Sequence, residues 1–298
     1  MNRTASAPSL KTFSGDEDRP GSTTFRIAIL GGGHLGRACA AGFIRSGIDP
    51  GRIRVGEPDP ERRIGLERDL SVVAQADNRA LVEWAQVVLV AIRPSDLGTV
   101  LAPLRAVWGS GVYRVVSLAA GVPVAQLRQW IPDAVRLMRA MPNLAVAMGQ
   151  GVIAVYAPDA IAETDRRLLE SLFNRLGTVF WLEVEDQLNL VTALSGSGPA
   201  YFFYFMEQLE AAAVAMGMEP RMARLLVMKT GIGSLALAEA GQGAFRELRE
   251  QVTSPGGTTA AAFAQLSRPG FPEGIAAAVR AAYDRARALA HPSPETKP

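Results

Sequence analysis

Two stretches of the sequence combine residue types and spacings that suit chemistry, and the more unusual one is "TSPGGTT". It contains Ser254, Gly256, Gly257, Thr258 and Thr259, and an alanine-rich apolar run follows it directly. We expect it to open a helix, whose first turn leaves about four backbone N–H groups unpaired and suits a carboxylate. The glycines would let a ligand approach the backbone, and the threonines add hydroxyls. Taken alone, the stretch is equally consistent with a capped helix that does no chemistry.

The second stretch is "IAILGGGHLGRACAAG", which places Gly31, Gly33 and Gly36 in a G-x-G-x-x-G spacing between an apolar strand and a helix start. In a dinucleotide site the first glycine permits a tight turn, the second lets the pyrophosphate reach the backbone, and the third lets the helix pack closely. The alternative is that these glycines serve only strand–helix packing. We expect His34 to face the cofactor rather than act as an acid or base, because a helix N-terminus disfavours its protonated form.

An acidic residue follows the glycine loop at the distance expected for a ribose contact. Glu57 ends the next strand, and a carboxylate there would bind the adenosine ribose hydroxyls and repel a 2′-phosphate. This position favours NADH over NADPH. Arg62 and Arg63 leave two alternatives: they turn towards such a phosphate, or they pair with Glu61 and Glu67 on a solvated helix face.

Two further strands end in residues that suit a cofactor. In "VLVAIRPSDL" and "VVSLAAGV" these residues are Ala91, Arg93 and Pro94, then Ala119 and Ala120. Open α/β sheets bind ligands at the carboxyl edge of their strands, and small residues leave room for a flat nicotinamide ring. A plain turn is the alternative for the second segment.

The elements that must position these residues follow a regular alternation. Short β-branched runs, "FRIAIL", "RIRVGE", "VVLVAI" and "YRVVSL", alternate with helical stretches ending near Ser46 and covering 59–70, 95–107 and 123–130. Such alternation predicts right-handed βαβ units and a mainly parallel sheet. "GVIAVYA" and "GTVFWLE" flank a helix over 164–176 and are expected to add edge strands. Residues 25–185 are therefore expected to form an α/β Rossmann-type dinucleotide-binding domain.

Beyond residue 185 the pattern is helical throughout. We expect helices over 186–194, 199–216, 220–240, 245–252, 258–266 and 270–290, which together make an all-helical second domain over 186–291. Alanine and apolar residues surround much of each helix, which indicates faces buried against more than one neighbour and therefore a homodimer formed through this half. Polar segments at both ends, 1–24 and 292–298, are expected to be disordered tails.

The composition excludes several classes of function. The chain has 298 residues, 48% of them hydrophobic, and a net charge of +2, which would attract neither nucleic acid nor an anionic membrane. Cys39 is the only cysteine, and His34 and His291 are the only histidines, so neither a disulfide nor a metal site is expected. No apolar run reaches the roughly 20 residues of a spanning helix, and no signal peptide is evident. We expect a cytoplasmic protein with a small-molecule partner.

The order and spacing of several motifs resemble the Δ1-pyrroline-5-carboxylate reductase family. The motifs are "LGGGHLG", "DN" at 77–78, "VAIRP", "LAAGVP", "RAMPN", "ALSGSGPAY" and "VTSPGGTT", and the resemblance runs from about Phe25 to Leu289. "SGSGPAY" and "TSPGGTT" are the specific signatures. The resemblance implies reduction of a carboxylated cyclic imine to L-proline with NAD(P)H. It also implies a Rossmann domain followed by a helical domain that dimerises, with dimers often assembling into rings.

The resemblance also assigns roles to residues. It implies that the substrate carboxylate rests on the turn of Ser254, Gly256, Gly257, Thr258 and Thr259, and that Thr259 is catalytic because it hydrogen-bonds the ring nitrogen. To the cofactor candidates given above, the motifs add Leu35, Asn78 and Asn143. The chemistry agrees: an imine accepts hydride once its nitrogen is protonated, so the protein mainly aligns and anchors the reactants.

The chain departs from the family pattern at a few positions. The family commonly has Asn, Met and Ala where this loop has His34, Leu35 and Gly36, a lysine at the position of Arg93, and "MPNTP" where this chain reads "MPNLA". Leu144 and Ala145 favour one alternative, a reductase of another small cyclic imine or keto acid. Together with His34, they also leave a catalytically silent nucleotide-binding paralogue as an alternative.

Overall fold

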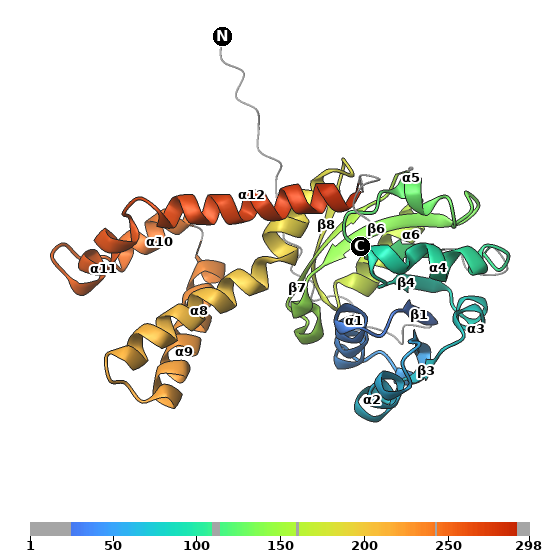
Figure 1. Cartoon of the computed structure of the whole chain (residues 1–298), viewed down its shortest axis with the longest axis horizontal. Helices are drawn as coiled ribbons and strands as arrows, with labels where there is room; N and C mark the ends of the chain where they lie inside the picture. The colour runs from blue at the N-terminus through green and yellow to red at the C-terminus, as the bar shows by residue number, and fades with distance from the viewer. Residues whose placement is uncertain (1–24, 109–113, 159–160, 242, 291–298) are drawn as a thin grey trace, which may run out of the picture.

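The structure, a computed structural model, describes residues 25–108, 114–158, 161–241 and 243–290. The first part of the chain forms a sheet covered by helices, and the later part extends from that sheet as an arm of long helices (Figure 1). The two expected tails, 1–24 and 292–298, lie outside the described residues, as does His291.

The strands of the described residues form one eight-stranded sheet in the order β3-β2-β1-β4-β5-β6-β7-β8. Their bounds are β1 Ile27–Leu30, β2 Ile53–Gly56, β3 Val73–Gln75, β4 Val87–Val90, β5 Arg114–Ser117, β6 Arg136–Pro142, β7 Gly151–Tyr156 and β8 Gly177–Leu182. All neighbours are parallel except β6 and β7. The first six strands have the 3-2-1-4-5-6 order of a dinucleotide-binding fold, so the expected fold class is confirmed.

Helices cover both faces of the sheet. They are α1 His34–Arg45, α2 Pro60–Leu70, α3 Asn78–Trp84, α4 Leu97–Leu101, α5 Val124–Leu127 and α6 Glu163–Phe173. In β1, Ile27 and Ile29 belong to an apolar cluster that includes side chains of α1, α2 and α6. Ala28 and Leu30 belong to another cluster with side chains of α3, α4 and α5. Strands buried on both faces read as continuous apolar runs, which is why "IAIL" and "VVLV" were recognisable in the sequence.

Two strands, β3 and β6, are not predicted by their local sequence. β3 is only three residues long, and β6 carries two arginines that obscure its apolar alternation. Both arginines are neutralised by distant acidic residues, since Arg136 lies 2.8 Å from Asp165 and Arg139 lies 2.9 Å from Glu185. The strand therefore tolerates charges that its local sequence alone would not explain.

Two other expectations were wrong in detail. The runs "GVIAVYA" and "GTVFWLE" were both expected as edge strands, but β7 lies between β6 and β8, and of these two strands only β8 is at an edge. The helix expected over 95–107 is broken into a 3₁₀ turn, the short α4 and a second 3₁₀ turn, Ala102–Leu104. Pro103 lies in that second turn, and proline has no N–H for a continuing helix.

The remaining helices form the arm. They are α7 Gln187–Val191, a π turn over Thr192–Gly196, α8 Gly198–Ala215, α9 Pro220–Ala240, α10 Phe245–Gln251, α11 Thr258–Leu266 and α12 Phe271–Ala290. α8 and α9 pair as a hairpin, and α10 and α11 lie at the far end of α12 (Figure 1). No helix in the described part of the chain has the length and apolar character needed to cross a membrane.

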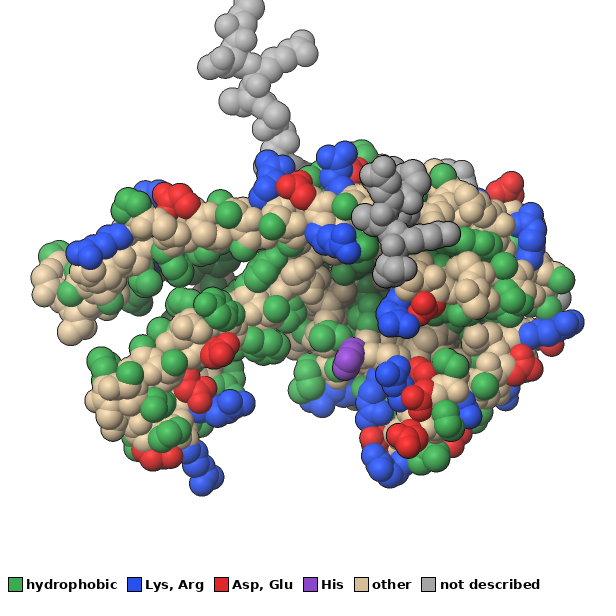
Figure 2. Space-filling view, viewed as in Figure 1, with side chains coloured by type: hydrophobic (Ala, Val, Ile, Leu, Met, Phe, Trp, Pro, Cys, Tyr) green, Lys and Arg blue, Asp and Glu red, His purple; other side chains and the backbone are tan. Residues whose placement is uncertain are grey.

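The arm has very little core of its own. Among its described residues, the buried apolar side chains are Leu188, Ala193, Ala223 and Ala286. Many large apolar side chains are exposed instead, including Phe202, Phe203, Leu235 and Leu237. The arm has two branches, the α8–α9 hairpin and the group of α10, α11 and α12, and Figure 2 shows hydrophobic side chains along both. Exposed apolar faces of this kind are typical of surfaces that contact another protein.

Candidate active site

The glycine loop joins β1 to α1, and its first and third glycines are required by the fold itself. Gly31 has a φ of +105°, and its N–H donates to the carbonyl oxygen of Gly56 at 2.8 Å. A Cβ on Gly31 would overlap the carbonyl oxygen of Ala91, and a Cβ on Gly36 would overlap that of Gly31. The loop therefore lies tightly against β4, and α1 lies tightly against the loop.

Gly33 differs, because packing within the chain does not require it. A Cβ on Gly33 would meet no atom within 4 Å. Gly33 is the N-cap of α1, and no side chain caps the helix or places an acid in its first turn. A helix start with open N–H groups and a side-chain-free approach fits a pyrophosphate. His34, at the first position of α1, is exposed, and Leu35 is half-buried.

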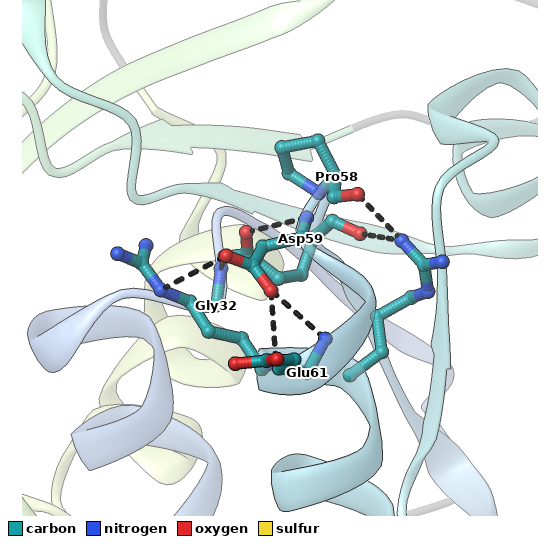
Figure 3. A network of polar contacts seen from close by, with 7 residues as sticks. Gly32, Pro58, Asp59 and Glu61 are labelled. Carbon is teal, nitrogen blue, oxygen red and sulfur yellow. Dashed lines mark hydrogen bonds and ion pairs between the residues drawn. The ribbon is translucent and has the colours of Figure 1, made fainter.

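Glu57 holds the glycine loop to the start of α2. Its carboxylate accepts the N–H of Gly32 on Oε2 and the N–H of Asp59 on Oε1, both at 3.1 Å (Figure 3). Only 4% of the residue is exposed. Each carboxylate oxygen has two lone pairs, so each can accept one further donor, such as a ribose hydroxyl.

The two arginines after Glu57 contact groups other than Glu61 and Glu67. Arg63 Nη1 donates to the backbone carbonyl oxygens of Glu57 at 2.9 Å and Pro58 at 2.7 Å. Arg62 Nε lies 4.0 Å from a carboxylate oxygen of Asp59, and the side chain of Asp59 caps α2. The alternative in which they pair with Glu61 and Glu67 is therefore wrong, because the carbonyl oxygens of Glu57 and Pro58 and the carboxylate of Asp59 are their partners instead.

Asn78 has a buried polar atom with no partner in the described chain. It opens α3, and its Oδ1 lies so close to Gly56 that a Cβ there would overlap it. This Oδ1 has no hydrogen-bond donor among the described residues. Because an unsatisfied buried acceptor costs free energy, the end of β2 is a place where a ligand hydroxyl would be favoured.

The carboxyl ends of β4 and β5 meet beside the loop. The N–H of Ala91 donates to the carbonyl oxygen of Leu30 at 2.8 Å, which places Ala91 next to Gly31. Pro94 starts a 3₁₀ turn, and the exposed Arg93 is paired with Asp96 at 2.9 Å. After β5, Ala119 is buried and Ala120 is half-buried. The cofactor candidates of these two strands therefore lie along one edge of the sheet.

Asn143 is engaged within the chain rather than free. Its Oδ1 accepts the N–H groups of Ala145 and Val152 at 3.2 and 3.4 Å. Its Nδ2 donates to the carbonyl oxygen and Oγ of Ser195 at 3.3 and 3.2 Å. The amide thus joins the end of β6 to the π turn. Sequence reasoning missed Ser195, although the signature "SGSGPAY" begins there.

The "TSPGGTT" turn opens α11. Gly256 has a φ of +73°, and the N–H of Gly257 donates to the carbonyl oxygen of Ser254 at 3.0 Å. Gly257 is the N-cap, and no side chain caps the helix, so neither Thr258 nor Thr259 acts as its cap. Both threonines are exposed.

A single chain does not bring this turn to the glycine loop. In Figure 1, α11 lies at the tip of the arm, whereas α1 lies at the sheet. Within the described residues, no hydrogen bond or ion pair joins residues 254–259 to the sheet part. The two candidate half-sites are therefore separate in one chain.

Comparisons with known proteins match both parts of the chain. Residues 185–289 match a model described as pyrroline-5-carboxylate reductase dimerisation, and residues 26–121 match one described as NADP oxidoreductase coenzyme F420-dependent. A pyrroline-5-carboxylate reductase of Plasmodium falciparum, solved with NADP bound, is 24% identical with a TM-score of 0.82 over 91% of this chain and all of that one. At that identity the likeness shows the fold.

More similar relatives show more than the fold. The pyrroline-5-carboxylate reductase of Vibrio alginolyticus is 34% identical over 89% of this chain and 97% of its own length. That of Mycobacterium tuberculosis is 37% identical over 89% of this chain and 96% of its own. A solved structure of the Coxiella burnetii protein is 34% identical, with a TM-score of 0.79 over 89% of this chain and 98% of that one. The chain thus belongs to the pyrroline-5-carboxylate reductase family, as an NAD(P)-dependent oxidoreductase with a helical dimerisation domain.

Proposed function

We propose that this chain reduces 1-pyrroline-5-carboxylate to L-proline with NAD(P)H. The observation that carries the proposal is the family relationship at 34–37% identity over nearly the full length of the relatives. Two features of the chain itself support it. One is a glycine loop open at Gly33, and the other is the turn at α11, where no side chain caps the helix start and the side chains of Thr258 and Thr259 are exposed.

We assign the cofactor to the carboxyl edge of the sheet. The N-terminus of α1 would hold the pyrophosphate at Gly33, while Glu57 and Asn78 would accept hydrogen bonds from ribose hydroxyls. The segments at Ala91 and Ala119 would border the nicotinamide. When bound, the nicotinamide supplies the hydride that reduces the C=N bond.

We assign the substrate to the turn at the start of α11. The backbone N–H group of Thr258 would bind the carboxylate, because the helix start carries unpaired donors and the positive end of the dipole. The hydroxyl of Thr259 would hydrogen-bond the ring nitrogen and so orient the imine carbon. Such a site works by alignment and needs no histidine.

We infer that the complete site forms between two chains. The turn and the glycine loop are separate in one chain, and the arm presents large exposed apolar side chains that would gain a core from a partner. A second copy could place its α11 turn over the first copy's sheet edge. Rings of such dimers remain our expectation for the larger assembly.

We propose that NADH is preferred over NADPH. The Glu57 carboxylate lies at the end of β2 and accepts two backbone N–H groups, so a 2′-phosphate beside it would meet a like charge. Arg63 already donates to two carbonyl oxygens and would have to leave them to reach a phosphate. Arg62, paired only at 4.0 Å, is the residue best able to oppose this preference.

We also propose the cytoplasm as the location of the protein. The only cysteine, Cys39, is buried, and burial raises the pKa of its thiol to about 12, so it is an inert packing group. A lone thiol of this kind fits a compartment that keeps cysteines reduced.

One assay tests the proposed function against its alternatives. NADH and NADPH oxidation would be followed with pyrroline-5-carboxylate, its six-membered homologue and several keto acids. We expect the highest kcat/KM with pyrroline-5-carboxylate. A higher value with another compound would favour a different imine or keto acid, the alternative suggested by Leu144 and Ala145. Cofactor binding without turnover of any compound would favour a silent paralogue.

A further inference from the structure

One carboxylate, that of Glu185, joins three segments of the chain. Glu185 lies between β8 and α7, where the chain leaves the sheet and enters the arm. Its Oε1 accepts the backbone N–H of Val124 at 2.7 Å and Nη1 of Arg139 at 2.9 Å. The first contact reaches the segment that follows β5, and the second reaches the middle of β6.

The ion pair with Arg139 constrains the position of the Glu185 carboxylate. Its side chain is only 6% exposed, and its Nε has no partner among the described residues. Burial lowers the pKa of Arg139, while the Glu185 carboxylate opposes that shift. Leaving a buried cation unpaired would cost free energy, so the buried guanidinium of Arg139 keeps the Glu185 carboxylate in place. The position of Oε1 is therefore fixed by the interior of the sheet.

Val124 is the far end of the segment after β5. The near end is fixed to the sheet, because the N–H of Leu118 donates to the carbonyl oxygen of Val90 at 2.9 Å. Ala119 and Ala120 lie between these two anchors. The carboxylate that holds Val124 belongs to the start of the arm, so this segment is held by β4 on one side and by the arm's first residues on the other.

From this arrangement we propose that Glu185 is a positioning residue for the reaction. It holds the 118–124 segment in the position that places a nicotinamide ring against Ala119 and Ala120, and it fixes that segment to the first residues of the arm. The inference rests on the proposed function for the assignment of the nicotinamide to this segment. Glu185 itself need not touch cofactor or substrate.

The opposite ends of the same strands provide a matched control. Asp165, at 1% exposure, is paired with Arg114 of β5 at 2.6 Å and with Arg136 of β6 at 2.8 Å. These contacts lie at the amino ends of the strands, away from the cofactor edge. Loss of this carboxylate removes a buried ion pair from the same two strands without releasing the 118–124 segment.

The experiment uses the full chain with Glu185→Ala, Glu185→Gln and Asp165→Asn. Deuterium exchange of a peptide covering 118–127 reports the segment, and we expect about tenfold faster exchange in Glu185→Ala only. The affinity for NADH should fall about fivefold in that variant while the affinity for ADP-ribose, which lacks the nicotinamide, stays within about twofold. With pyrroline-5-carboxylate, kcat should fall about tenfold with KM changing less, since small misplacements reduce rate.

Glu185→Gln keeps an oxygen that accepts both donors, so it should restore exchange and the NADH-to-ADP-ribose affinity ratio to near the parent values. Asp165→Asn should lower Tm without changing that ratio. The inference is overturned if Glu185→Ala lowers only Tm, or if it weakens NADH and ADP-ribose equally. A parent chain that binds NADH but reduces no imine would contradict the proposed function. Exchange and the affinity ratio would still decide the role of Glu185.

Discussion

At the scale of single residues, Thr259 has an exposed hydroxyl in the first turn of α11 that caps nothing in its own chain. We predict that Thr259→Ala lowers kcat/KM for the imine by about 10- to 100-fold, the loss of one polar contact to a charged group. Steady-state kinetics would measure this loss, and NADH affinity should stay unchanged. Thr258→Ala is the matched control, with a smaller effect because its backbone N–H remains. Equal activity of Thr259→Ala and the parent would remove Thr259 from the mechanism.

Glu57 is the second residue whose role can be isolated. Glu57→Gln keeps oxygen acceptors for the N–H groups of Gly32 and Asp59 but removes the charge. We predict that it raises kcat/KM with NADPH and lowers it modestly with NADH, because like-charge repulsion of the 2′-phosphate is relieved. Comparison of the two cofactors in parent and variant measures the change. A parent that already favours NADPH, with Arg62→Ala abolishing that preference, would assign cofactor choice to the arginine.

At the scale of elements, the loop between β1 and α1 contains one glycine that packing requires, Gly31, and one that only cofactor binding would require, Gly33. A Cβ on Gly33 meets no atom within 4 Å, whereas one on Gly31 overlaps Ala91 at a φ of +105°. We predict that Gly33→Ala weakens NADH binding at least about tenfold with Tm nearly unchanged, because only the approach of the pyrophosphate is blocked. Gly31→Ala should lower both NADH affinity and Tm. Titration of NADH and thermal unfolding would measure the pair, and a Gly33→Ala variant with normal affinity would place the pyrophosphate elsewhere.

At the scale of the whole molecule, we expect the exposed apolar faces of the arm to form the contacts between chains. Phe203 on α8 is 66% exposed and Leu235 on α9 is 57% exposed. We predict that the parent is a dimer or larger by light scattering, and that Phe203→Arg or Leu235→Arg shifts it towards monomer. Activity should be lost while NADH binding to the sheet part persists.

Ile64→Arg is the control for that experiment, since Ile64 is 62% exposed on α2, outside the arm. This variant should leave unchanged both the molar mass of the assembly measured by light scattering and the activity. A monomeric parent with full activity would show that one chain completes the site, contrary to the inference that two chains are needed.

Local patterns in the sequence determined many of the strands and helices of this protein and the glycine loop. The apolar runs of β1 and β4, the spacing of Gly31, Gly33 and Gly36, and the ends of α9 and α11 are properties of short segments, and each was predicted. β3 and β6 were not predicted. β3 is too short for a pattern, and the arginines of β6 are tolerated only because Asp165 and Glu185 approach from other elements.

The tertiary structure alone decided which polar groups meet. It placed Glu57 under the glycine loop, turned Arg63 onto backbone carbonyl oxygens, joined Asn143 to Ser195, and brought Glu185 to Val124 across 61 residues of sequence. It also placed the "TSPGGTT" turn away from the sheet of its own chain. Spacing along the chain determines which residues share a helix or a turn. Contacts between distant segments depend on how whole elements pack, and no local pattern contains that information.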